Sequence, residues 1–60
     1  MFALVRTGRR YRVVRTDDCP YGAEILCRDD VRIDLRLTKD WCIEQERQGY
    51  HPNRSDFGEE

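Results

Sequence analysis

The sequence has no long apolar run, and this absence excludes a helix that spans a membrane. Its longest uninterrupted apolar stretch is residues 1–5, whereas a membrane-spanning helix needs about 18 or more consecutive apolar residues. That start also lacks the basic segment and the long apolar core of a secretory signal. We therefore expect a cytoplasmic protein.

The chain also has few of the side chains that catalysis uses. It contains one histidine, His51, and one serine, Ser55, both in a polar C-terminal segment. A nucleophile needs a base within hydrogen-bond reach and a third group that orients the base. The acid pairs at residues 17–18 and 29–30 lie in expected turns, where aspartate is common for backbone reasons. A chain of 60 residues buries little surface in which to enclose a cleft, so we expect no enzyme.

Cysteine is scarce and odd in number, which argues against a disulfide framework. Cys19, Cys27 and Cys42 are expected to be free thiols in a reducing compartment. Together with His51 they would make three sulfur ligands and one imidazole, a set that structural zinc sites use. Their gaps of 8, 15 and 9 residues are wider than the usual spacing of paired zinc ligands. We predict no metal and no cofactor, with zinc binding as the alternative.

The most regular pattern has a period of two residues. Val31, Ile33, Leu35 and Leu37 alternate with charged residues, which predicts a half-buried strand over residues 31–37. Weaker patterns of the same kind predict strands at 2–6, 11–16 and 23–28. The segment 2–6 is apolar on both faces, as a central strand covered on both sides would be.

Short turns join these segments. Gly8 suits a tight hairpin, residues 17–22 are rich in turn formers, and residues 29–30 resemble a two-residue hairpin loop. The predicted fold is therefore mainly β (small α+β), a four-stranded antiparallel meander that could curl toward an SH3-like barrel. We expect one domain over residues 1–50 and a flexible tail over 51–60.

The segment 39–48 admits two interpretations. Thr38 could cap a short C-terminal helix that ends at Gly49, and its residues are good helix formers. The alternative is a further strand that uses Trp41 and Ile43. With the helix, the predicted core is Leu4, Val5, Val13, Ile25, Cys27, Val31, Ile33, Leu35, Leu37, Trp41 and Ile43.

Charge is unevenly distributed along the chain. Residues 1–16 carry five arginines and no acid, whereas residues 17–60 carry six basic and twelve acidic residues. Such asymmetry is typical of an interaction surface, although opposite charges on neighbouring strands could also pair within the chain. The candidate partner-binding residues are those of the first predicted hairpin: Arg6, Arg9, Arg10, Tyr11, Arg12 and Arg15.

Two classes of function fit this layout. The first is a small non-enzymatic protein-binding module, an adaptor or inhibitor of the size found among phage or mobile-element accessory proteins, which uses the arginine-rich hairpin and a sheet edge. An open edge would also offer a route to a homodimer. The alternative is a small β-barrel that binds RNA or single-stranded DNA, with arginines on phosphates and Tyr11 stacked on a base. The sequence isoelectric point of about 5.8 favours the protein-binding class.

Overall fold

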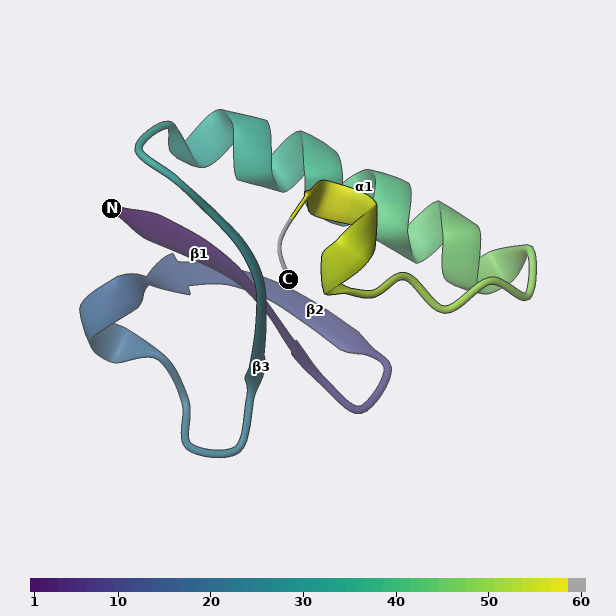
Figure 1. The fold of residues 1–60 in the computed structure, drawn as a ribbon, viewed down its shortest axis with the longest axis horizontal. Helices are drawn as coiled ribbons and strands as arrows, with labels where there is room; N and C mark the ends of the chain where they lie inside the picture. The colour runs from purple at the N-terminus through teal and green to yellow at the C-terminus, as the bar shows by residue number, and fades with distance from the viewer. Residues whose placement is uncertain (59–60) are drawn as a thin grey trace.

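The computed structural model describes residues 1–58 and shows a small α+β fold. An open, three-stranded antiparallel sheet has the strand order β2-β1-β3, and one long helix crosses one of its faces (Figure 1). Two short 3-10 helices complete the chain. The elements are β1 (Phe2–Thr7), β2 (Arg10–Arg15), η1 (Thr16–Asp18), β3 (Glu24–Asp29), α1 (Arg32–Arg47) and η2 (Arg54–Phe57).

Strand β1 is the centre of the sheet and is covered on both faces. Ala3, Leu4 and Val5 are each at most 1% exposed, so side chains of both parities are withdrawn from water. The predicted central strand is therefore confirmed, and it ends at Thr7. Gly8 then adopts φ 63°, the left-handed region that the tight turn into β2 requires.

The four-stranded meander is wrong in two respects. Strand β3 pairs with β1 and not with β2, so the chain crosses over the central strand between β2 and β3. The segment 31–37, predicted as a strand, lies almost entirely in α1. The three strands form an open sheet, and an SH3-like barrel is not confirmed.

Residues 29–30 turn the chain from β3 into α1, where we expected a hairpin loop. The side chain of Asp29 accepts a hydrogen bond of 2.8 Å from the backbone N–H of Val31, a local turn that redirects the chain. Leu, Arg, Lys, Glu and Gln then dominate the following sequence, and all are strong helix formers. Of the two interpretations of 39–48 the helix is confirmed, but it begins seven residues earlier, at Arg32.

The alternation at residues 31–37 does not mark a buried face. Only Leu35 of these residues is buried, whereas Ile33 and Leu37 are each 64% exposed. Leu35 and Cys42 are seven residues apart, and this spacing returns to the same face of a helix. Both belong to the core cluster of Leu4, Tyr11, Leu26, Leu35 and Cys42. The predicted core is wrong for Val31, Ile33, Leu37, Trp41 and Ile43, which are all exposed.

The C-terminal segment that we expected to be a tail packs against the domain as far as Gly58. Pro52 is buried, and η2 contacts β3. Asn53 and Asp56 form a reciprocal cap at the start of η2, and the Tyr50 hydroxyl donates to Asp56 at 2.8 Å. The expectation for residues 59–60 lies outside the described part of the chain.

Helical geometry predicts unequal effects for two neighbouring leucines. Leu35→Ala should lower the free energy of unfolding by about 2–4 kcal/mol, since it leaves a cavity under α1. Leu37→Ala should change it by less than about 0.5 kcal/mol, because its side chain is largely exposed. Urea denaturation followed by far-UV circular dichroism measures both. Equal losses would contradict the helical register.

Candidate binding edge on strand β2

The outer edge of β2 has no strand beside it. The N–H of Thr16 donates to the carbonyl of Met1 at 3.3 Å, which identifies Met1 and Thr16 as a hydrogen-bonded pair. Such pairs alternate with non-bonded pairs along an antiparallel ladder, so every second residue of β2 turns its N–H and C=O away from β1. In this register these outward-facing residues are Tyr11, Val13 and Arg15.

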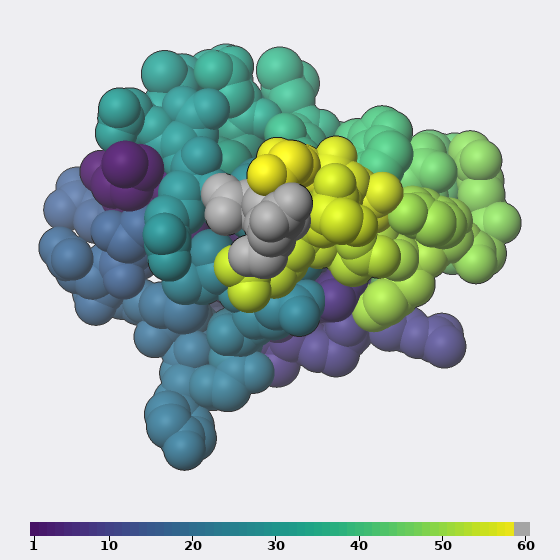
Figure 2. Space-filling view, viewed as in Figure 1, coloured from purple at the N-terminus to yellow at the C-terminus, as the bar shows by residue number. Residues whose placement is uncertain are grey.

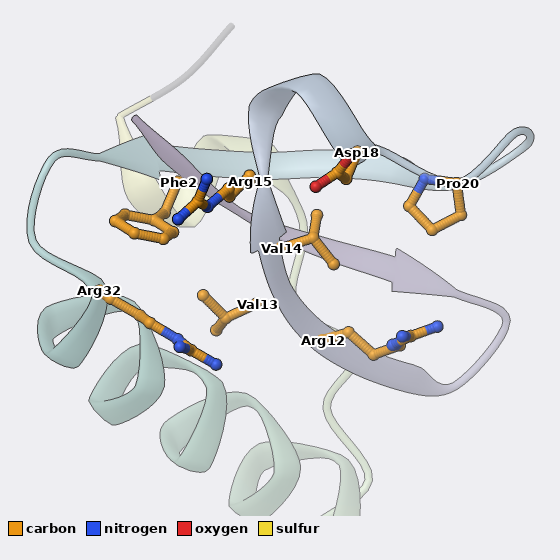
Figure 3. A pocket seen from close by; sticks show the side chains of 8 residues that line it. All are labelled: Phe2, Arg12, Val13, Val14, Arg15, Asp18, Pro20 and Arg32. Atoms are coloured by element: carbon orange, nitrogen blue, oxygen red, sulfur yellow. The ribbon is translucent and has the colours of Figure 1, made fainter.

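A hollow of about 380 Å³ lies along this edge. Figure 3 shows Arg15 and Arg32 on the side of β2 that carries Phe2 and Val13, with Arg12 on the opposite side. Asp18 is the single acidic residue among those that line the hollow. The edge is therefore flanked by guanidinium groups on both faces of the sheet.

These arginines are not neutralised within residues 1–58. The ion pairs found there involve Arg6, Arg47 and His51, and none involves the three arginines of the hollow. Their head groups keep donors for a ligand, and the planar fork of arginine fits carboxylate or phosphate oxygens. We call Arg12, Arg15 and Arg32, together with the outward backbone of β2, the β2 edge site.

Arg6 is largely buried, and its side chain bonds to other residues of the same chain. Its guanidinium donates to the Glu24 carboxylate and to the Pro52 carbonyl, and its side chain is 11% exposed. Register places Arg6 opposite Glu24 on β3, so the ion pair spans two adjacent strands. The bond to Pro52 ties the C-terminal segment to the sheet.

Tyr11 is also internal, with 7% of its surface exposed. Burial raises the pKa of its hydroxyl, and the nearby Arg6 guanidinium opposes this change. The ring fills the core under α1, where it cannot stack on a ligand. The fully exposed aromatic is Tyr21, in the loop between η1 and β3 that projects from the molecule (Figure 2).

The remaining two candidates lie at the turn end of the hairpin. Arg10 is exposed and starts β2. Arg9 lines a different hollow, of about 460 Å³, with Glu46, Gly49 and His51. The Glu46 carboxylate lies 3.0 Å from Nδ1 of His51, so this second hollow already contains an acid.

Arg32 is the site residue that sequence reasoning missed. It opens α1, and the chain reversal at residues 29–30 brings it to Arg15. With residues 31–37 read as a strand, Arg32 belonged to a solvated face remote from the first hairpin. No local signal links two arginines that lie seventeen positions apart.

The cysteines offer little reactive chemistry. All three are free thiols, and Cys42 is fully buried. Burial raises the pKa of Cys42 to about 11, with a smaller contribution from Cys27. Within residues 1–58 no three His, Cys, Asp or Glu side chains are grouped so that they could hold a metal ion.

Comparisons with protein-family models, with curated proteins and with solved structures found no match for this chain. In the part of the chain that the structure describes, no helix has the length and apolar character needed to cross a membrane.

The different roles of Arg6 and Arg12 predict different effects on stability. Arg6→Gln should lower the free energy of unfolding by about 1–3 kcal/mol, because a charged hydrogen-bond donor to Glu24 and Pro52 is lost. Arg12→Gln should change it by less than about 0.5 kcal/mol, since its exposed side chain makes no ion pair within residues 1–58. Urea denaturation of both variants tests this, and comparable losses would show that Arg12 also serves the fold.

The pKa of about 11 for Cys42 predicts a protected thiol. At pH 8 its thiol is protonated, and the thiolate is the reactive form. Alkylation by iodoacetamide, located by peptide mass spectrometry, should modify the half-buried Cys19 well before Cys42. Cys42 should react only after urea unfolds the chain. Rapid modification of Cys42 in the folded protein would contradict its burial.

Proposed function

We propose that the protein is a non-enzymatic binding module that captures an acidic, extended segment of another protein along β2. The observation that carries this proposal is the β2 edge site, where unpaired backbone groups are flanked by three arginines that form no ion pair within residues 1–58. An extended peptide that adds to a sheet edge gains main-chain hydrogen bonds, and its alternate side chains provide specificity.

The arginines match the side-chain alternation of an added strand. Arg15 lies on the α1 face of the sheet beside Arg32, whereas Arg12 lies on the opposite face. Successive side chains of a strand point to opposite faces, so acids at neighbouring positions of the ligand would meet arginines on both faces. Charge-assisted pairs of this kind are about twice as strong as neutral hydrogen bonds.

Strand β3 is the less suitable edge. The short helix η2 packs against it, and Glu24 at its start is already paired with Arg6. The contacts of β2 within residues 1–58 are chiefly to β1 and to α1, and α1 lies over one face of the sheet (Figure 1). An incoming strand therefore meets fewer obstacles at β2.

A nucleic-acid ligand is the alternative that the same arginines allow, because they would also bind phosphates. The burial of Tyr11 removes the aromatic from the hairpin that was expected to stack on a base. The free edge of β2 presents both N–H donors and C=O acceptors. A peptide backbone can pair with both, whereas phosphate groups can only accept hydrogen bonds. These two points favour a protein ligand.

A labelled peptide with pairs of adjacent Glu residues separated by Thr, which places acids on both faces of an added strand, tests the proposal by fluorescence anisotropy. We expect saturable binding that weakens about tenfold or more in Arg15→Gln, where a charge-assisted bond is lost. Arg28→Gln is the matched control, because Arg28 is exposed on β3, which the central strand β1 separates from the β2 edge. A peptide with Gln in place of Glu should bind more weakly, and one with central prolines, which lack the N–H group, should not bind.

Amide chemical shifts and a nucleic-acid control complete this test. On binding, the amides of Tyr11, Val13 and Arg15 should shift most. Single-stranded RNA is measured in parallel at about 50 and about 300 mM salt. Tight, salt-sensitive RNA binding without peptide binding would support the nucleic-acid alternative, and binding of neither would overturn the proposed function.

A further inference from the structure

The outer face of α1 carries an apolar ridge that the monomer leaves uncovered. Ile33 and Leu37 are each 64% exposed and Trp41 is 43% exposed. They are spaced four residues apart, so they follow one another along a single side of the helix. Isolated exposed apolar residues are ordinary on a protein surface, but a contiguous patch marks an interaction site. We call Ile33, Leu37 and Trp41 the α1 ridge.

One side of the ridge is already ordered by the C-terminal segment. The rings of Trp41 and Phe57 meet edge to face, with centroids 6.0 Å apart. A shallow hollow of about 400 Å³ lies between α1 and η2, lined by Leu37, Thr38, Trp41, Asp56 and Phe57. The Trp41 side chain is thus held in place before any partner arrives, which lowers the entropic cost of docking.

Ile33 and Trp41 lie at equal spacing on either side of Leu37, an arrangement that suits a second copy of the same ridge. If a second α1 lies antiparallel across it with a two-fold axis near Leu37, then Leu37 meets its own copy and Ile33 meets Trp41 of the second chain. Helices that interlock through residues four apart form the commonest packing class in globular proteins. A two-fold interface of this kind is self-complementary.

The flanking charges agree with the same axis. Arg36 and Asp40 lie along one flank of the ridge, and neither forms an ion pair within residues 1–58. In the antiparallel arrangement the Arg36 of each copy faces the Asp40 of the other, so two ion pairs form across the axis. Glu44 approaches the first turn of the second helix, where the positive end of the helix dipole lies.

We propose that the protein forms a two-fold homodimer in which the α1 ridges of two copies pack antiparallel. The helix has 16 residues and a length of about 24 Å, so the contact is smaller than the roughly 800 Å² per partner of a standard interface. A weak dimer, with a dissociation constant in the micromolar range, is therefore expected. The ridge lies on the side of α1 remote from the sheet, so dimerisation leaves both β2 edges open.

Sedimentation equilibrium from about 10 µM to about 1 mM protein measures the association. We expect a monomer–dimer equilibrium in the natural protein and only monomer in Leu37→Lys, where two like charges would meet at the axis. Ile43→Lys is the matched control, since Ile43 is 42% exposed on another side of α1 and should leave the dimer intact. Circular dichroism checks that each variant keeps its fold.

A charge swap distinguishes this dimer from any other apolar association. Arg36→Asp alone and Asp40→Arg alone should each weaken dimerisation about tenfold, because each places like charges opposite one another. The double variant restores both cross-axis pairs and should return to within about threefold of the natural constant. A protein that stays monomeric to about 1 mM, or a dimer that neither Leu37→Lys nor the charge swap affects, would overturn the proposal.

Discussion

The structure depends on the narrow apolar stripe through which α1 packs against the sheet, because few side chains of this helix are buried. Two fully buried side chains, Leu35 and Cys42, attach a helix of 16 residues to the sheet, and they meet Leu4 and Leu26 in one small cluster. A chain of this size withdraws only about 60% of its unfolded surface from water, and α1 contributes one narrow stripe to a core whose other buried residues lie in the strands. The other apolar residues of α1 must face solvent or a partner.

The strands could be predicted from sequence more reliably than the helix. The run at residues 2–6 is apolar at every position before Arg6, which is typical of a strand covered on both faces, and the structure places β1 at the centre of the sheet. At residues 31–37 the alternating pattern favours a strand. Leu35 fits both a strand and a helix, so this residue by itself does not distinguish between them. Cys42, a small and weakly apolar residue, was the second point of the helical stripe, and its position between the larger apolar residues Trp41 and Ile43 concealed the pattern.

The candidate site illustrates the same limit. Parity along β2 separates Arg12 from Arg15 in any strand register, so their placement on opposite faces was within reach of the sequence. The ion pair between Arg6 and Glu24 could not be predicted from the sequence. It forms because β3 pairs with β1, and this pairing brings Glu24 opposite Arg6. Pairing order is a long-range property that a single strand pattern does not contain. Arg32 likewise reaches the site through a long-range arrangement, because the turn at residues 29–30 places the start of α1 beside β2.

The uneven distribution of charge in the sequence persists in the folded protein, because several acidic side chains form hydrogen bonds with residues close to them in the sequence. Asp29 holds the turn into α1, Asp56 caps η2 and accepts from Tyr50, and Glu46 contacts His51. Glu24 is the acid that neutralises an arginine of the first hairpin. Asp18 lines the hollow beside β2, but neither Arg12 nor Arg15 forms an ion pair within residues 1–58. Arg12 and Arg15 of the first hairpin thus lie where the backbone is also unpaired, and under the proposed function both features would act on the same ligand.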